Sequence, residues 1–184
     1  MTDILIAGAG LAGLTAAARL GADGHQVVLI DPAGDVPPDL RTTAFLAPSI
    51  ETLERAGAWA AMQEHGAPLR TMRLVDAGGP EPVVRETADF TADAAGRDMF
   101  GWNVPNTAAR TALLARISEL PNVRRVVGES VKGYVSRTDE AILRLAGGDQ
   151  IAARLVLAAD GRGSTLRELA GLKVRRWPYG QSAL

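Results

Sequence analysis

The 184-residue sequence has no cysteine and only two histidines, His25 and His65. Without cysteine, disulfide bridges and thiolate metal sites are excluded, and two histidines are too few for a histidine-rich metal site. We therefore expect no metal centre. A chain without cysteine also suits a reducing cytoplasm, which is where we expect the protein.

Neither charge nor hydrophobicity is concentrated enough to indicate nucleic-acid binding or a membrane span. Twenty Lys and Arg face 21 Asp and Glu, for a net charge of −1, so no basic field favours nucleic acid or anionic lipid. No run approaches the roughly 18 apolar residues of a membrane-spanning helix. The start, Met1-Thr2-Asp3, lacks the positive charge of a signal peptide. We expect a soluble, untargeted globular chain.

A glycine-rich turn lies between the first predicted strand and the first predicted helix. An apolar run at 3–7 is typical of a buried parallel strand, an alanine-rich helix is predicted at 14–20, and a second buried strand at 26–30. The turn between them, Gly8-Ala9-Gly10-Leu11-Ala12-Gly13, reads G-x-G-x-x-G. In this βαβ context the pattern predicts a dinucleotide site, because glycines let a diphosphate approach the amides at a helix N-terminus.

Asp31 closes the second predicted strand, where a carboxylate can accept hydrogen bonds from both hydroxyls of an adenosine ribose. A carboxylate there would also repel a 2′-phosphate, which disfavours NADP at this site. The alternative is that Asp31 only ends the strand before Pro32. FAD and NAD share the adenosine diphosphate half, so this motif does not distinguish them.

Asp160 follows another predicted buried strand, at 154–159. The carboxyl end of a parallel strand faces the crevice where α/β sheets bind ligands, so Asp160 is a candidate ligand contact. The alternative is a simple Asp160-Gly161 turn with Ser164 capping a short helix at 164–170.

Two arginines are further candidates. Arg110 shares one stripe of a helix predicted at 107–120 with Leu113 and Ile117, and an arginine on such a stripe must find an anion or extend to solvent. A cofactor diphosphate would satisfy it with two hydrogen bonds. Arg41 by itself is uninformative.

The remaining segments give weaker predictions. Ser49 is expected to cap a helix that ends at Arg55 before Gly57. The other expected elements are a helix at 59–64, strand-like sequence at 69–84 broken at 78–80, a loop or strand pair at 87–98, and strands at 123–127, 131–135, 141–145 and 151–153.

Four motifs occur together in this order along the chain. They are Gly8 to Gly13 with Asp31, Arg41-Thr-Thr-Ala-Phe-Leu, Phe100-Gly-Trp-Asn-Val-Pro-Asn before Arg110, and Ala159-Asp160-Gly161 with Ser164 and Arg167. In combination they resemble the FAD-dependent aromatic-ring hydroxylases of the para-hydroxybenzoate hydroxylase type. The final segment, 177–184, is similar to the ubiquinone-biosynthesis branch of that family.

The resemblance implies a set of cofactor-binding residues and no catalytic residue. The residues expected around the diphosphate are Gly8, Gly10, Leu11, Ala12 and Gly13, and Asp31 is expected at the ribose. Arg41 and Arg110 would lie along the flavin and the diphosphate, and the main chain of Val131 would contact adenine. Asp160 would belong to the segment that the family uses for FAD and reduced pyridine nucleotide.

The resemblance also implies the fold and the domains. We expect an α/β chain: a doubly wound, Rossmann-like FAD-binding domain with a β-meander, interleaved with part of a second, substrate-domain sheet. Residues 1–66 and 105–172 would form the first domain, and 67–104 with 173–184 the second. The later Gly-Asp segment of the family does not occur before Leu184, so we expect a truncated, N-terminal part of a longer enzyme.

The activity implied is hydroxylation of an aromatic ring with FAD, NAD(P)H and oxygen, on a small aromatic or polyprenyl-phenol substrate of ubiquinone biosynthesis. The expected location is the cytoplasm or the periphery of the inner membrane, in contact with a biosynthetic complex and with no nucleic acid. Two alternatives are open: another flavoprotein on the same scaffold, such as an isoprenoid reductase or halogenase, and a non-catalytic NAD-binding module.

Overall fold

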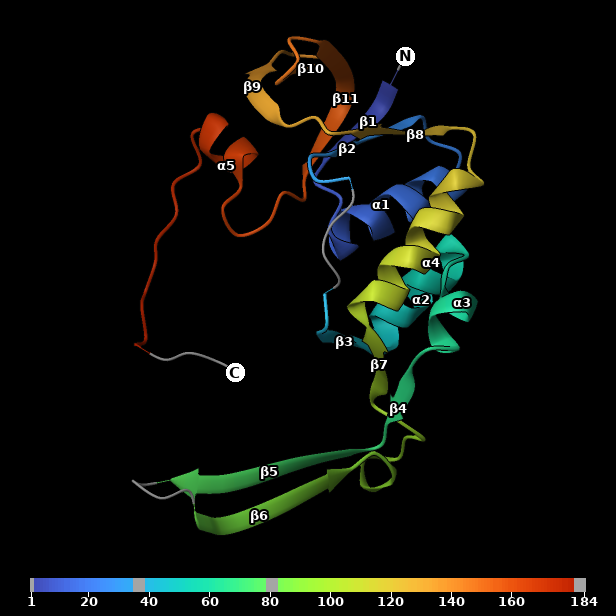
Figure 1. Ribbon diagram of the computed structural model, residues 1–184, viewed down its shortest axis with the longest axis vertical. Coiled ribbons are helices and arrows are strands. Elements are labelled where there is room, and N and C mark those ends of the chain that lie inside the picture. Colours follow the sequence, from blue (N-terminus) through green and yellow to red (C-terminus); the bar gives the residue numbers. More distant parts are fainter. Residues whose placement is uncertain (1, 35–38, 79–82, 181–184) are drawn as a thin grey trace.

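The computed structural model describes residues 2–34, 39–78 and 83–180 (Figure 1). A six-stranded sheet, in the order β8-β2-β1-β11-β10-β9, forms the centre of the fold. Its strands are β1 (Thr2–Ala7), β2 (Val27–Asp31), β8 (Val123–Val127), β9 (Val131–Ser136), β10 (Ala141–Leu145) and β11 (Gln150–Ala158). The first four strands in the order are parallel, and β10 and β9 add to them as an antiparallel meander. This architecture confirms the predicted α/β fold.

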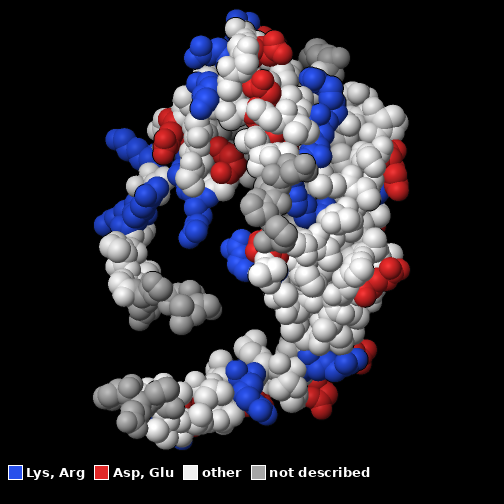
Figure 2. Space-filling view, in the orientation of Figure 1, with Lys and Arg blue, Asp and Glu red and all other residues white. Residues whose placement is uncertain are grey.

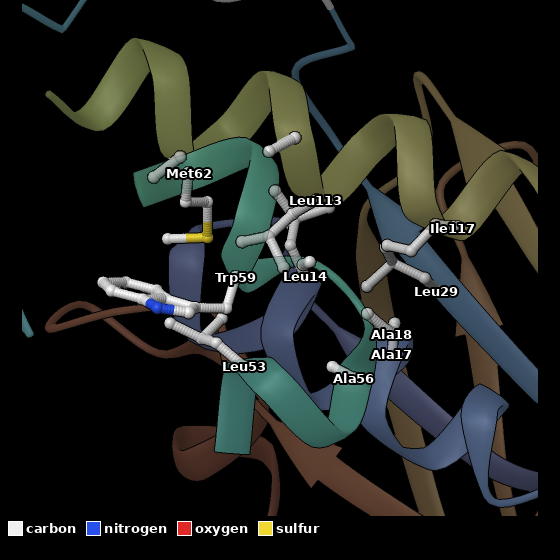
Figure 3. Close-up of a cluster of buried hydrophobic side chains, with 14 of the residues drawn as sticks. Leu14, Ala17, Ala18, Leu29, Leu53, Ala56, Trp59, Met62, Leu113 and Ile117 are labelled. Carbon is white, nitrogen blue, oxygen red and sulfur yellow. The ribbon is translucent and has the colours of Figure 1, made fainter. Parts of the chain in front are cut away.

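Helices α1 (Leu11–Ala22) and α4 (Asn106–Ser118) pack together over one face of this sheet, and α2 (Ala47–Ala56) and α3 (Trp59–Gln63) lie beside them. Figure 3 shows the core between them, where Leu14, Leu29 and Leu113 are fully buried. Each such leucine stabilises the fold by about 2 kcal/mol through removal of its side chain from water. The packing of α1 against this face of the sheet fixes the position of its N-terminus.

The other face of the sheet has its own buried cluster. Leu5, Val28 and Ile30 point to this side, whereas their neighbours Ile6 and Leu29 point to the α1 side, as the two-residue period of a strand requires. The short helix α5 (Thr165–Leu169) contributes its buried Leu166 to this cluster. Both faces therefore carry a buried cluster, although Leu155 of β11 and Val127 of β8 stay half exposed.

A second, smaller sheet joins β3 (Thr42–Leu46), β7 (Gly101–Pro105) and β4 (Ala67–Leu69) in the order β3-β7-β4. The hairpin of β5 (Thr71–Gly78) and β6 (Val83–Thr91), followed by the turn η1 (Asp93–Ala95), projects from it (Figure 1). Figure 2 shows a broad hollow between this hairpin and the C-terminal segment, with charged side chains of both signs above it. No helix in the described ranges has the length and apolar character needed to cross a membrane.

Two local predictions are wrong. Helix α2 begins at Ala47 with Leu46 as its N-cap, because Pro48 in the first turn has the fixed φ that favours a helix start; Ser49 is not the cap. The segments predicted as separate strands at 151–153 and 154–159 form one strand, β11. Its first half pairs with β10 and its second half with β1, so no break is needed.

Candidate functional site

A cavity of about 540 Å³ opens where β1, β2 and β11 end, at the carboxyl edge of the parallel sheet. It is lined by Gly8, Ala9, Gly10, Leu11, Asp31, Pro32, Ala33, Asp39, Arg41, Asn106, Arg110, Ala159, Asp160 and Gly161. Ligands of open α/β sheets bind at this edge. A larger cavity, of about 700 Å³, lies at the opposite end of β1 beside His25 and Arg154, and none of the predicted site residues lines it.

The three glycines of the turn have different roles. Gly8 has a φ of 103°, and a Cβ there would lie 2.4 Å from the carbonyl oxygen of Ala159. A Cβ on Gly13 would lie 1.9 Å from the carbonyl oxygen of Gly8, so both positions exclude a side chain. At Gly10 a Cβ would meet nothing within 4 Å. Gly8 and Gly13 therefore maintain the close packing of the turn, whereas Gly10 borders open space in the cavity.

The N-terminus of α1 presents free amides to this cavity. The N-cap is Gly10, which offers no side-chain oxygen, and the first turn contains no acidic residue. Within the described residues, the amides of Leu11 and Ala12 donate no hydrogen bond to the protein. Unpaired amides and the positive end of the helix dipole together favour an anion such as phosphate.

Asp31, at the end of β2, is buried between two arginines. Its Oδ2 accepts hydrogen bonds from Arg125 Nε at 2.9 Å and Nη2 at 2.5 Å, and from Arg110 Nη2 at 3.4 Å. The Asp31 side chain is only 3% exposed. The carboxylate lines the cavity, as expected. Its negative charge is paired with the guanidinium groups of Arg125 and Arg110.

Arg110 connects the glycine turn to the loop after β2. Its Nη1 donates to the carbonyl oxygen of Ala9 at 2.5 Å, and its Nη2 donates to that of Gly34 at 3.0 Å. Its side chain is 19% exposed, so it neither reaches freely into solvent nor lies fully inside the core. The guanidinium keeps further N–H groups beside the cavity, because a guanidinium has five donors.

Arg41 lies at the rim, in a network with polar neighbours. Its side chain is 81% exposed and pairs with Asp39 at 2.7 Å, and Asn106 Nδ2 donates to Asp39 Oδ2 at 2.8 Å. Thr43 Oγ1 in turn donates to Asn106 Oδ1 at 2.6 Å. The hydrogen bonds from Arg41 and then Asn106 hold the pKa of Asp39 well below its usual range. The network fixes Asp39 as an anion next to the entrance.

Asp160 lines the cavity and also supports the first turn of α5, whose N-cap is Ser164. Its Oδ1 accepts from Ser164 Oγ at 2.5 Å and its Oδ2 from the amide of Leu166 at 3.0 Å, while Ser164 Oγ accepts from the amide of Arg167. The capping role left open from the sequence is therefore present, and the ligand role remains a prediction.

The other predicted residues are less central. Ala12 lines a neighbouring cavity of about 450 Å³ together with Leu11. Gly13 is buried beneath the turn. Val131 starts β9, lies in the second core cluster and does not line the cavity, so its contact with adenine is a prediction that the cavity does not support.

Sequence reasoning missed Arg125 and Asn106. Arg125 comes from β8, whose pairing with β2 brings it to Asp31. The available signal was an arginine within the strand predicted at 123–127, since a charge that becomes buried in a sheet requires a partner. Asn106, the first residue of α4, belongs to a quoted motif, but nothing in the sequence pointed to Asp39 as its partner.

Comparison with known proteins agrees with this geometry. The family model described as FAD binding domain matches residues 1–178. The ubiquinone hydroxylase UbiL of Rhodospirillum rubrum is 32% identical over 191 residues, which cover 100% of this chain and 43% of that protein. The 3-demethoxyubiquinol 3-hydroxylase of Escherichia coli is 34% identical over 191 residues, covering 100% of this chain and 47% of that protein. The chain thus spans less than half the length of these curated relatives.

Solved structures show the same fold. The p-nitrophenol 4-monooxygenase PnpA of Pseudomonas putida superposes with a TM-score of 0.79 at 21% identity, over 94% of this chain and 44% of that chain. PqsL, a probable FAD-dependent monooxygenase of Pseudomonas aeruginosa, superposes with a TM-score of 0.76 at 23% identity, over 97% of this chain and 48% of that chain.

Proposed function

The chain belongs to the FAD binding domain family, and from this premise we propose that it is the N-terminal part of an FAD-dependent monooxygenase that hydroxylates an aromatic ring. The observation that carries the proposal is the glycine turn at the exit of β1. There, the amides of Leu11 and Ala12 are free at the start of α1, and Gly10 and Leu11 line the cavity at a point where a side chain on Gly10 would fill open space.

The residues of this cavity fit an FAD diphosphate. Two unpaired amides and the end of a helix dipole offer hydrogen bonds and positive potential to the phosphates. Arg110 adds a guanidinium at the same place, held by Ala9 and Gly34 so that little freedom is lost on binding. We place the adenosine ribose beside Asp31 and the flavin side of the cofactor towards Arg41.

When bound, FAD would supply the redox chemistry, which is acceptance of hydride from NAD(P)H and activation of oxygen. The chain's own residues would bind and orient it. Arg110 and the α1 amides would hold the diphosphate, and Asp160, fixed by Ser164, would hold the adjacent loop in place. Among the described residues we assign no proton-transfer pair.

We propose a polyprenyl phenol of the ubiquinone pathway as the substrate. Support comes from the names of the two relatives at 32% and 34% identity, both of which are hydroxylases of ubiquinone compounds. We also propose that 67–104 and 173–184 belong to the domain that contacts this substrate, whereas 1–66 and 105–172 bind FAD. The exposed β5–β6 hairpin, within 67–104, is available for such a role.

The test is the visible spectrum of the purified chain with FAD, next to the same chain extended past Leu184 to the length of its relatives. We expect flavin absorbance to remain with the extended form after gel filtration, and the extended form to incorporate labelled oxygen into a phenol in the presence of NAD(P)H. An extended form without bound flavin would contradict the FAD assignment. Reduction of a double bond in place of oxygen incorporation would contradict the monooxygenase assignment.

A further inference from the structure

Asn106 links the start of α4 to the segment 39–43 at the rim of the cavity. The antiparallel pairing of β3 with β7 brings Thr42 opposite Pro105, the residue before Asn106. The amide of Asn106 donates to the carbonyl oxygen of Arg41 at 2.9 Å. The first residue of α4 therefore lies against the segment that carries Arg41, and both residues line the cavity.

The side chain of Asn106 also hydrogen-bonds to this segment and, in the described part of the chain, to no amide of its own helix. Asparagine at the start of a helix commonly accepts a hydrogen bond from an amide of the first turn. Here Nδ2 donates to Asp39 Oδ2 at 2.8 Å, and Oδ1 accepts from Thr43 Oγ1 at 2.6 Å. Both polar atoms of the side chain thus serve the rim and not the helix.

The charge of Asp39 fixes the orientation of this amide. Arg41 Nε and Nη2 donate to Asp39 Oδ1 and Oδ2 at 2.8 and 2.7 Å, and these bonds hold the pKa of Asp39 well below its usual range. An ionised carboxylate only accepts hydrogen bonds, so the NH2 group of Asn106 must face it. The amide oxygen is then left to the hydroxyl of Thr43, a residue that does not line the cavity.

This network restrains a side chain that is otherwise free. Arg41 is 81% exposed, and its partner Asp39 lies only two residues away in the same loop. Their ion pair alone therefore ties neither side chain to the helices. A long side chain loses entropy when a ligand orders it, and a group that is ordered beforehand loses less. The hydrogen bond from Asn106 supplies the attachment to α4.

We infer that Asn106 is a positioning residue for the flavin half of FAD: through Asp39 it holds the Arg41 guanidinium at the rim of the cavity. Thr43 acts one step further away, by holding Asn106 in the orientation that this requires. The inference rests on the proposed function, because it takes the flavin side of FAD to lie towards Arg41. ADP ends at the diphosphate, so affinity for FAD should depend on Asn106 and affinity for ADP should not.

The experiment measures the Kd of FAD and of ADP by calorimetry with the whole chain, because their ratio reports the flavin half alone. The unmodified protein should bind FAD about tenfold more tightly than ADP. Asn106→Ala should weaken FAD about tenfold and change the Kd of ADP by less than about twofold.

Thr43 separates positioning from direct contact. Thr43→Val removes the hydroxyl and should weaken FAD about fivefold, whereas Thr43→Ser keeps the hydroxyl and should recover most of that loss. The double variant with Asn106→Ala should bind FAD no more weakly than Asn106→Ala alone, because both changes break the same network. The matched control is Thr87→Val on the exposed strand β6, which should leave the ratio of the two Kd values unchanged.

The outcomes separate the inference from the proposed site. If Asn106→Ala weakens FAD and ADP alike, Asn106 only supports the fold, and the inference is overturned while the nucleotide site stands. If Thr43→Val leaves the ratio unchanged, or if the unmodified chain binds FAD no more tightly than ADP, the positioning role is also overturned. If the unmodified chain binds neither ligand, the proposed site fails and the inference with it. Should Asn106→Ala not fold, the ratio measured for Thr43→Val decides by the same criteria.

Discussion

Arg110 of α4 donates a 2.5 Å hydrogen bond to the carbonyl oxygen of Ala9, although 101 residues separate the two in the chain. Helix α4 therefore holds the glycine turn from the side. Along the chain, α4 comes after all three strands of the second sheet. Gly34, in the loop after β2, accepts from the same guanidinium. One guanidinium therefore links the turn, the loop after β2 and α4.

Arg110→Lys tests this clamp. Lysine cannot reach both carbonyl oxygens in the geometry of a guanidinium fork, so we expect FAD affinity to fall about tenfold and the free energy of unfolding to fall by about 1–3 kcal/mol. Fluorescence titration and urea unfolding measure the two effects. Arg55→Lys, on the exposed side of α2, is the control and should change neither. An unaltered Arg110→Lys protein would show that the clamp is dispensable.

Gly10→Val separates binding from folding. Gly10 has an ordinary φ of −69° and open space at its Cβ position, so the fold should tolerate valine. The side chain would occupy the space beside the free amides, and we expect equilibrium dialysis to show loss of FAD binding at an unchanged melting temperature. Gly163→Val, at another glycine with open space, should keep FAD binding. Retained binding in Gly10→Val would be incompatible with a diphosphate at this turn.

Gly13→Ala should have the opposite effect. The new Cβ would overlap the carbonyl oxygen of Gly8 and press on Ala159, so we expect a loss of about 2–3 kcal/mol in the free energy of unfolding. Chemical denaturation measures it. Gly10→Ala, three residues earlier, has room and should cost less than about 1 kcal/mol. Equal costs at both positions would contradict the packing described for the turn.

Leu113→Ala tests the core beneath the site (Figure 3). Leu113 is fully buried between α1 and its neighbours, and its truncation leaves a cavity that should lower the free energy of unfolding by about 3 kcal/mol. Leu172→Ala, at a side chain that is 63% exposed, should stay within about 0.5 kcal/mol of the original. A small effect at Leu113 would mean that this face is packed differently.

Asp39 should contribute to the acid dependence of stability. The hydrogen bonds from Arg41 and Asn106 hold its pKa below the ordinary value of 3.8 in the folded chain. Because the folded-state pKa is the lower one, the contribution is complete above the ordinary pKa and is lost as the pH falls below it. Asp39→Asn should flatten this part of a stability curve recorded from about pH 5 to pH 2.

The control is Glu54→Gln, whose carboxylate makes no hydrogen bond or ion pair in the described part of the chain. Its curve should follow that of the unmodified protein. If the stability of Asp39→Asn falls at acid pH with the same slope as that of the unmodified protein, the hydrogen bonds from Arg41 and Asn106 do not stabilise the Asp39 carboxylate.

Local patterns were sufficient to predict the βαβ unit and its glycine turn, because the strand, the turn and the helix follow one another directly. The start of α2 was less clear, since both Pro48 and Ser49 are compatible with the first turn of a helix. The proline, and not the serine, determines where the helix begins. Strand β11 was divided into two because its pairing partner changes from β10 to β1 at Ala153.

The surroundings of Asp31 could not be predicted from the sequence. Arg125 is 94 residues away, and its position depends on β8 pairing with β2, a parallel contact that no local pattern specifies. The position of Asp31 itself was predictable, because it ends an apolar run. Its charge environment, set by Arg125 and Arg110, was not.

The most direct measurement of the central claim is the amide NMR spectrum of the isotopically labelled chain during titration with ADP. We predict saturable shifts that are largest at the amides of Gly10, Leu11 and Ala12, and their absence when adenosine, which lacks the diphosphate, replaces ADP. Shifts centred on the larger cavity beside His25, or equal shifts with adenosine, would contradict a diphosphate held at the start of α1.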